Sequence, residues 1–318
     1  MGDGASGPEV SILLEVDNVR RKGTARALQS LTALAAEVSA TDRDVEVLVG
    51  CPGDTADAWF HHLLRQSTLD TTGPRPVRVV PTESRRYYAV KNQLADRAAG
   101  DILVFTDADV IAQSGWLDAL LAPLRDEHVS VTCGHTVVGP PVGTYARAMS
   151  ACWIFDPTPQ PGVSPRSTFH ANSVAFRRST FLERHFPERP DEYRGACARL
   201  AAELQRDGIT VWLAGDAVTM HPPLAGMRDF VSSGLLSGHS WALRRAEEFG
   251  RGHWRRAVRW TGAGWRNTML TVWQRRTICG LGPLGLVTAW VLGSALWVLR
   301  FAGLCVGRIR PGALVRFM

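Results

Sequence analysis

The sequence predicts an α/β protein, with a mostly parallel, Rossmann-like sheet flanked by helices and a C-terminal region of amphipathic and membrane helices. Short apolar runs typical of buried strands alternate with helical patterns, and one of these runs ends in Asp107 and Asp109. Regular alternation of strands and helices is the order of a doubly wound parallel sheet. An uncharged stretch over Thr277–Leu299 predicts the membrane part.

The elements of the sheet can be assigned in order along the chain. In each strand the apolar residues form a short continuous run, and in each helix they recur at helical spacing. The order is a strand at Val10–Asn18, a helix over Ala27–Ala35, a strand from Val45 closed by the Pro52-Gly53 turn, a helix at Ala58–Leu64, a strand at Val77–Pro81, a helix at Tyr88–Ala95 and a strand from Asp101.

The Asp107-Ala108-Asp109 segment follows the apolar run Ile102–Phe105. Ligands of open α/β sheets bind at the carboxyl ends of the strands. Hard divalent cations such as Mg²⁺ or Mn²⁺ prefer oxygen ligands and often bridge carboxylates to substrate phosphates. The pair therefore predicts a metal-diphosphate site. In the alternative interpretation, Asp107 caps a helix starting near Gln113 and Asp109 is a solvated turn residue.

Several segments in this order resemble the family-2 glycosyltransferases with the GT-A fold. The resemblance extends from about Val10 to Pro223. It rests on Ser11–Leu14, Glu46–Val49, Lys91–Ala95 with Ala99–Asp109, Trp116-Leu117, Asn172–Arg178 as an acceptor-side strand, and Asp216–Pro222 as a late strand ending in histidine.

The resemblance implies transfer of a sugar from a nucleotide-diphosphate-sugar to an acceptor hydroxyl, with Mg²⁺ or Mn²⁺ as cofactor. A neutral imidazole can complete a metal shell beside two carboxylates, which would make His221 a third ligand. In the alternative interpretation, His221 ends a strand and only forms hydrogen bonds with the backbone. The expected sites are the metal ligands Asp107, Asp109 and His221, the donor-binding residues Glu15, Asp17, Asn18, Lys91, Asn92 and Asp107, and the acceptor-binding residues His170, Asn172 and Arg194.

Two departures from the family pattern concern the donor and the catalytic base. Cys51 and Pro52 stand where the family usually has an Asp pair that reads the nucleobase. Ala196 and Cys197 stand where it usually has a Glu-Asp pair, one member of which is the general base. The identity of the donor and of the base therefore stays open.

An inverting transfer needs a base within hydrogen-bond reach of the attacking hydroxyl. Asp191 and Glu192 are the candidates, although a solvated loop or a helix N-terminus also favours acidic residues. A second hypothesis is a catalytically degenerate relative that binds a nucleotide or glycan at a membrane. A third is a nucleotidyltransferase, but the segment after the first strand is a poor substitute for a Gly-rich phosphate loop.

The C-terminal third of the chain predicts a membrane attachment. Between Arg244 and Arg276 nine arginines alternate with tryptophans, as suits anionic headgroups. A spanning helix follows, or a re-entrant hairpin broken near Pro283 or Gly293. The alternatives are a buried C-terminal helix packed on the domain and, given the net charge of +6, nucleic-acid binding, which no accompanying motif supports.

These observations divide the chain into predicted regions. The regions are a flexible N-terminus at 1–9, the catalytic domain at 10–225, basic Trp-rich interfacial helices at 226–276, a membrane anchor at 277–306 and a basic tail at 307–318. We expect the protein at the cell membrane with its catalytic domain in the cytoplasm, because the first residues lack the features of a signal peptide. The expected partners are a nucleotide-sugar, a lipid or glycan acceptor and the membrane, and no nucleic acid.

Overall fold

A computed structural model describes residues 7–16, 24–52, 58–69, 76–139, 142–189, 192, 194–224, 226–249, 254–310 and 312–314. The predictions for Asp17, Asn18 and Asp191 lie outside these residues. The chain forms two compact units. The first unit contains Met1–Thr136, Pro159–Pro187 and Ala196–His221, and the second contains Val137–Thr158, Glu188–Gly195 and Pro222–Met318.

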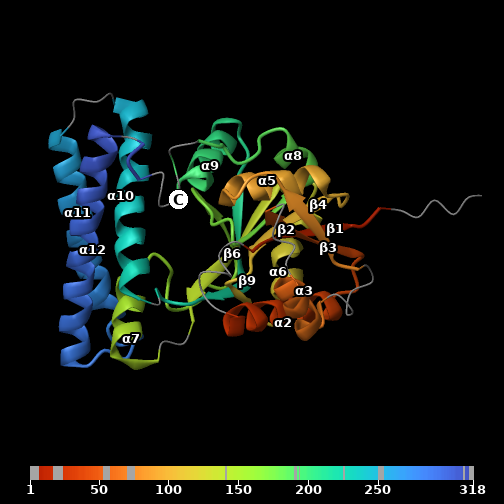
Figure 1. Cartoon of the computed structure of the whole chain (residues 1–318), viewed down its shortest axis with the longest axis horizontal. Helices are drawn as coiled ribbons and strands as arrows, with labels where there is room; N and C mark the ends of the chain where they lie inside the picture. The colour runs from red at the N-terminus through yellow and green to blue at the C-terminus, as the bar shows by residue number, and fades with distance from the viewer. Residues whose placement is uncertain are drawn as a thin grey trace, which may run out of the picture. The chain divides into compact units, whose positions relative to one another are not determined.

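The first unit is an α/β domain, as the sequence predicts (Figure 1). Its elements are β1 (Val10–Glu15), α2 (Thr24–Ala40), β2 (Val45–Pro52), α3 (Ala58–Ser67), β3 (Arg78–Thr82), α5 (Tyr87–Arg97), β4 (Ile102–Asp107), β5 (Ile111–Ala112), α6 (Trp116–Leu121), the 3₁₀ helix η1 (Ala122–Arg125), β6 (Val131–Val138), β7 (Val163–Arg166), β8 (Ser173–Arg177), α8 (Arg178–Leu182), α9 (Ala196–Arg206) and β9 (Val211–His221).

The sheet has the order β3-β2-β1-β4-β8-β6-β9-β5, and β7 pairs with β9. Strands β3, β2, β1 and β4 are parallel. From β4 onward, β4 and β8, β6 and β8, β5 and β9, and β7 and β9 pair antiparallel. The parallel part carries the site, because its register places Glu15 of β1 beside Asp107 of β4 at the carboxyl edge.

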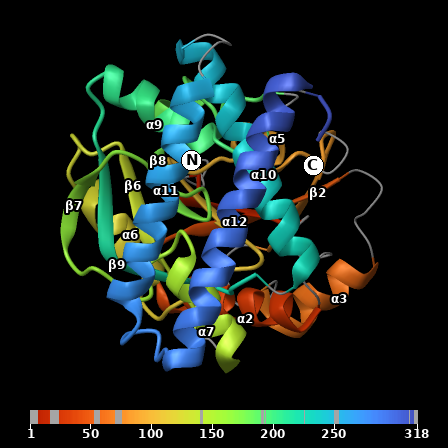
Figure 2. The ribbon, with the colours of Figure 1, turned by 90° about the vertical axis from the view of Figure 1, so that its left-hand side faces the viewer.

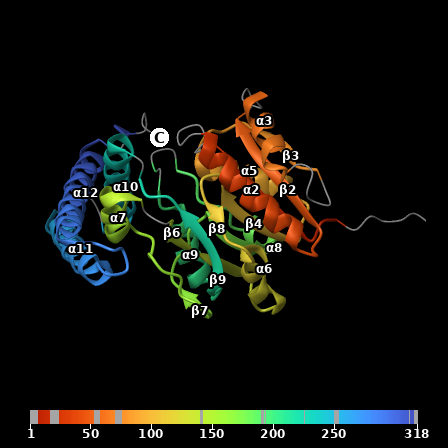
Figure 3. The same cartoon turned by 90° about the horizontal axis from the view of Figure 1, so that it is seen from below.

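Helices cover both faces of the sheet, with α2, α3 and α6 on one face and α5, α8 and α9 on the other (Figures 1 and 3). Alternate residues of β1 point to opposite faces, so Ile12 and Leu14 pack in the first core and Leu13 in the second. Each fully buried side chain of this size stabilises the fold by about 1.5–3 kcal/mol. The two cores fix the position of β4 and hence of the residues that follow it.

In the described part of the second unit, four helices lie side by side (Figure 2). They are α7 (Gly143–Cys152), α10 (Met227–Phe249), α11 (Trp254–Arg275) and α12 (Pro283–Ile309). Met149 and Cys152 of α7 share a core with Phe230 of α10 and Leu296 of α12. Because α7 buries its apolar face in this core, residues 137–158 group with the C-terminal helices, as do 188–195, and not with the catalytic domain in which the sequence analysis places them.

Helix α12 is the element predicted as the membrane anchor. It begins at Pro283, six residues after the predicted start at Thr277, and it continues unbroken through Gly293. Of the two positions considered for a break, the chain is therefore interrupted before Pro283 and not at Gly293. Proline suits the first turn of a helix because its missing N–H has no partner there in any case. By length and composition α12 could cross a membrane, with a mean hydropathy of 1.7 in its most apolar window.

Candidate functional site

The site begins at the turn that follows β4. Asp107 is the last residue of the strand, and the N–H of Ala108 donates to the carbonyl of Glu15 at 3.2 Å. Helix α2 holds the same turn from one side, since Ser30 Oγ donates to the carbonyl of Val110. The parallel pairing of β1 and β4 thus extends one residue beyond the strand and fixes the backbone between Asp107 and Asp109.

Asp107 is buried in a network of polar contacts with α5. Lys91 Nζ lies 2.7 Å from Asp107 Oδ1, and Tyr87 Oη donates to both carboxylate oxygens at 2.9 and 2.8 Å. Lys91 is 0 % exposed and also donates to the carbonyls of Thr106 and Ala171 at 2.9 and 3.1 Å. The contacts make Asp107 a carboxylate with a fixed orientation and a buried counter-charge.

The environment shifts the pKa of both acids in this network. Burial raises the pKa of Asp107, while the Lys91 ammonium acts in the opposite direction. Burial also raises the pKa of Tyr87 well above its usual range, and the charge of Asp107 adds to this shift. Tyr87 therefore keeps its hydroxyl proton at neutral pH and can donate it to the carboxylate.

The alternative interpretation of Asp107 as a helix cap is wrong. Helix α6 begins at Trp116, and its N-cap residue, Gly115, has no side chain that could cap the helix. Instead, the Glu37 carboxylate of α2 accepts hydrogen bonds from the N–H groups of Gly115 and Leu117, both at 2.9 Å. Asp107 is consequently available for a role at the edge of the sheet.

Asp109 and His221 form the second part of the site. Asp109 is 2 % exposed, and its Oδ2 lies 3.8 Å from His221 Nε2. His221 is the last residue of β9, and the pairing of β9 with β5 brings it to the turn after β4. An oxygen and a nitrogen donor this close fit a cation such as Mn²⁺, which accepts both ligand types.

The protein donors to a cation are few at this site. Within the described part of the chain, no group of three His, Cys, Asp or Glu side chains could hold a metal ion. Asp109 and His221 offer two ligands, and the predicted role of Asp107, whose two oxygens share the hydroxyl proton of Tyr87, as a further ligand stays a prediction. Magnesium-type sites commonly complete their shell with substrate phosphates and water. The chain's donors therefore fit a cation that is shared with a phosphorylated ligand.

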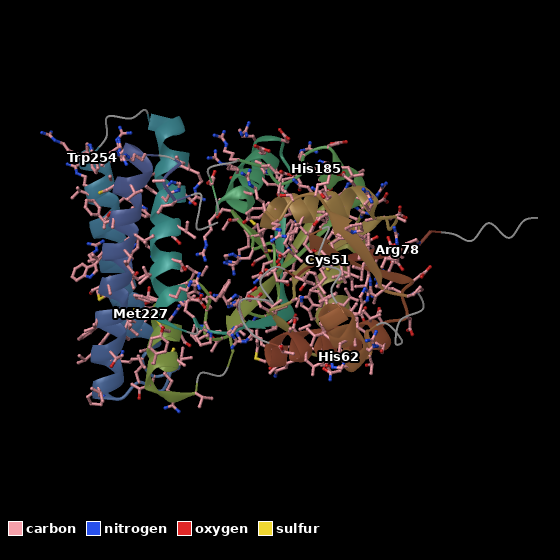
Figure 4. All side chains as sticks on the ribbon, viewed as in Figure 1. Cys51, His62, Arg78, His185, Met227 and Trp254 are labelled. Atoms are coloured by element: carbon pink, nitrogen blue, oxygen red, sulfur yellow. The ribbon has the colours of Figure 1, made fainter. Side chains whose placement is uncertain are left out.

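The other predicted donor residues differ in their surroundings. Glu15 is 1 % exposed and lies beside Asp107 in the sheet register. The Asn92 amide exchanges two hydrogen bonds with the backbone of Phe186, donating at 2.9 Å and accepting at 3.0 Å. These bonds show that Asn92 holds the chain at Phe186, and its contact with a donor stays a prediction. Cys51, at the end of β2, is buried (Figure 4).

The predicted acceptor residues belong to different units. In the first unit, Asn172 is buried and accepts a hydrogen bond from Thr136 Oγ1 at 3.1 Å, while His170 is exposed before β8. In the second unit, the Arg194 guanidinium donates to Ser237 Oγ at 3.2 Å. Their shared role at an acceptor stays a prediction.

The base candidates also have defined surroundings where the structure describes them. The Glu192 side chain is 4 % exposed, and its Oε1 lies 3.6 Å from Arg244 Nε within the second unit. At the position where a carboxylate base is expected, Cys197 is buried, contacts Tyr88 Oη at 3.4 Å, and burial raises its pKa to about 11. The Cys197 thiol is therefore protonated at neutral pH and cannot serve as a base there.

The sequence analysis misses two groups of residues that shape the site. Tyr87 precedes Lys91 by four residues, so the two lie on one face of a helix, and Lys91 Nζ is 4.8 Å from the Tyr87 ring centroid. That spacing is the signal that could have found Tyr87. Ser30 and Glu37 lie on α2, far from the turn in sequence, and no local pattern marks them.

Comparisons with known proteins bear on the family and the fold of the chain. A family model described as Glycosyl transferase family 2 matches residues 22–186. Among solved structures, the chain is similar to the mannosyltransferase PcManGT from Pyrobaculum calidifontis in complex with GDP-Man and Mn²⁺, with 15 % identity, a TM-score of 0.56, and coverage of 98 % of this chain and 89 % of that chain. A second similar structure is GalNAc-T7 with UDP, GalNAc and Mn²⁺, at 12 % identity and a TM-score of 0.47, covering 68 % of this chain and 43 % of that chain. No curated protein matches in sequence. At 15 % identity the first likeness establishes the GT-A fold alone.

Proposed function

The chain belongs to glycosyl transferase family 2, and we propose that it transfers a sugar from a nucleotide-diphosphate-sugar to an acceptor hydroxyl in a metal-dependent, inverting reaction at a membrane surface. The observation that carries the proposal is the arrangement at the carboxyl edge of the parallel strands. There, a buried carboxylate held by Lys91 and Tyr87 stands two residues from a second carboxylate that lies 3.8 Å from His221. Ligands of open α/β sheets bind at this edge.

The two carboxylates have separate roles in the proposal. Asp109 and His221 would hold the divalent cation, Mg²⁺ or Mn²⁺, because Asp109 Oδ2 and His221 Nε2 lie 3.8 Å apart at the carboxyl edge. When bound, the cation neutralises the diphosphate that leaves with the nucleotide. Asp107, oriented by Tyr87 and Lys91, accepts hydrogen bonds from the donor or from water bound to the metal. Glu15 lies beside it and extends the acidic edge toward the donor.

The base that activates the acceptor hydroxyl is the open step of the reaction. We assign it to Asp191 or Glu192, since the Cys197 thiol stays protonated. Glu192 Oε1 lies 3.6 Å from Arg244 Nε, and a general base must lie within hydrogen-bond reach of the acceptor hydroxyl. His170, Asn172 and Arg194 are proposed to contact the acceptor.

The proposed location is the cytoplasmic face of a cell membrane, with a lipid-linked or other envelope glycan precursor as acceptor. The support is the composition of the second unit. Helix α12 is long and apolar, and α11 carries exposed tryptophans and arginines, among them Trp265 and Arg266. Such a surface attracts anionic lipid headgroups.

The test is release of nucleoside diphosphate by membranes that contain the protein, with Mn²⁺ or Mg²⁺ and a panel of nucleotide-sugars. GDP-mannose and UDP-N-acetylgalactosamine enter the panel first, because the two similar structures bind GDP-Man or UDP with GalNAc. We expect metal-dependent release with at least one donor, increased by lipid extract as acceptor. No release with any donor would refute the transfer reaction and favour a degenerate, nucleotide-binding relative.

A further inference from the structure

The outer side of α11 and α12 exposes a row of large apolar side chains. On α12 they recur at helical spacing, with Leu284, Val287, Val291 and Val298 all more than half exposed. On α11 the tryptophans at 254, 265 and 273 are each more than 40 % exposed, and Figure 4 labels Trp254 at the start of this helix. Scattered apolar residues are ordinary on a protein surface, but a contiguous row of this length indicates a partner.

Contacts between α11 and α12 show that the two exposed rows belong to one face. The helices run antiparallel: the Trp273 ring stacks on Trp290 with centroids 6.4 Å apart, and the Arg308 guanidinium lies 5.1 Å from the Trp254 ring. Between these ends, Trp265 Nε1 donates to Ser294 Oγ at 2.9 Å. The hairpin is thus held together along its whole length.

The same register argues against a bilayer-spanning α12. Trp297 Nε1 donates to Thr268 Oγ1 at 2.7 Å, so the middle of α12 is level with residues 265–268 of α11. The exposed Arg266 lies within that segment. If α12 crossed a bilayer with α11 attached, Arg266 would lie beside residues 294–297 and enter the hydrocarbon, where a charged side chain is costly.

Length gives a second argument. Arg300 ends the uncharged part of α12, and its guanidinium lies 4.6 Å from the Trp297 ring. The segment Pro283–Leu299 is about 25 Å long at about 1.5 Å per residue. The hydrocarbon core is ~30 Å thick, so the uncharged part is short for a perpendicular crossing.

The inner side of α12 is closed by protein. Glycines spaced by four residues line the seam with α10, namely Gly234 and Gly238 on α10 and Gly303 and Gly307 on α12. A Cβ at Gly238 would overlap the backbone of Arg300, and one at Gly303 would overlap that of Leu235. Small residues at this spacing let two helix backbones approach closely. Lipid can therefore reach α12 only from its exposed face.

We propose that the α11–α12 hairpin lies in the plane of an anionic membrane surface, with its exposed apolar face immersed among the headgroups and upper acyl chains, and that α12 does not cross the bilayer. The exposed arginines of α11 at 255, 256, 259 and 266 supply the attraction to anionic lipid. The inference rests on the proposed membrane attachment and is independent of the transfer reaction.

The first test measures binding of the full chain to vesicles of phosphatidylcholine with and without phosphatidylglycerol. Val291→Glu should weaken binding by about tenfold or more, since a charge replaces an immersed apolar group. The matched control is Val163→Glu on β7, because the two valines are 62 % and 60 % exposed and neither supports a core. Equal binding of the two variants, or binding indifferent to anionic lipid, would overturn the proposed face.

The second test decides between lying in the plane and spanning. Thr277→Cys and Arg310→Cys, at exposed polar positions before and after α12, are combined with Cys305→Ser, since the other five cysteines are buried. The protein is reconstituted in vesicles and treated with a membrane-impermeant maleimide. The number of labels on each chain is then read from its intact mass by mass spectrometry. An in-plane hairpin gives chains with two labels or none, whatever their orientation, whereas a spanning helix gives chains with one label.

Nucleoside diphosphate release is measured on the same vesicles to separate this inference from the proposed reaction. Two-or-none labelling without release would leave the hairpin in place and refute the transfer. Release with single labels would support the transfer and overturn the in-plane hairpin.

Discussion

Replacing Lys91 with methionine should destabilise the first unit by about 3–5 kcal/mol, the usual cost of breaking a buried ion pair by removing one partner. Lys91 is 0 % exposed, and its ammonium is 2.7 Å from Asp107 and within hydrogen-bond distance of two carbonyl oxygens. Without it, the Asp107 carboxylate stays buried with only the Tyr87 hydroxyl as a donor among the contacts described above. Methionine fills a similar volume, so the loss measures charge more than packing.

Amide hydrogen exchange in β4 and β8 is the suitable assay, because it reports unfolding of the first unit separately from the second. The double variant Lys91→Met/Asp107→Asn removes both charges and should be clearly more stable than Lys91→Met alone. A loss below about 1 kcal/mol for Lys91→Met, where surface ion pairs fall, would refute the reasoning. So would a double variant whose loss equals the sum of the two single losses, because coupled partners are not additive.

Two further predictions concern the supports of the site. Glu37→Ala should cost about 1–3 kcal/mol, because it leaves the N–H groups of Gly115 and Leu117 without their acceptor; exchange at the amides of α6 checks this against the exposed control Glu127→Ala, and equal effects would contradict it. Between about pH 9 and pH 11 the unfolded Cys197 thiol loses its proton while the folded one keeps it, so stability falls as pH rises through this window. Cys197→Ala should lessen that slope in urea titrations; an unchanged slope would count against the buried, protonated thiol.

The N-terminal half of the sheet could be predicted because its strands are buried on both faces. Strands β1, β2 and β4 appear in the sequence as short continuous apolar runs, which are typical of parallel strands covered by helices on both faces. The helix predicted over Tyr88–Ala95 is part of α5, which extends over Tyr87–Arg97. Such local signals also carried the family resemblance, which the family match confirms.

The remainder of the sheet depends on pairings between distant segments. Strand β8 pairs with β4, which lies far from it in the sequence, and Phe176 stands opposite Leu103. The sequence analysis predicts no strand at the position of β6. Helix α7 looks like part of the catalytic domain because of its place in the chain, yet its apolar face packs against α12 in the second unit. The order of the elements along the chain predicts neither the pairing partner of β8 nor the unit to which α7 belongs.

The site was predictable by residue type and less so by role. The Asp-X-Asp segment predicts two carboxylates at the end of a strand. The different environments of these carboxylates depend on neighbours from α5 and β9. Asp107 meets Lys91 and Tyr87, while Asp109 meets His221. A three-residue pattern cannot distinguish a carboxylate with a buried lysine from one beside an imidazole.

In the proposed reaction, Asp109 and His221 bind the metal ion, while Asp107 has a separate role. This assignment is tested most directly by Mn²⁺ titration followed by electron paramagnetic resonance, with GDP and UDP as probe nucleotides. The account predicts one Mn²⁺ per chain in the presence of a nucleotide that binds. Asp109→Asn should weaken Mn²⁺ binding by about a hundredfold or more, since loss of outer-shell partners alone costs ~10–100-fold, and His221→Gln should weaken it by a smaller factor. Asp101→Asn, an exposed carboxylate just before the other end of β4, is the matched control and should bind as the wild type does. Wild-type Mn²⁺ affinity in Asp109→Asn would contradict the assignment of the metal to Asp109 and His221.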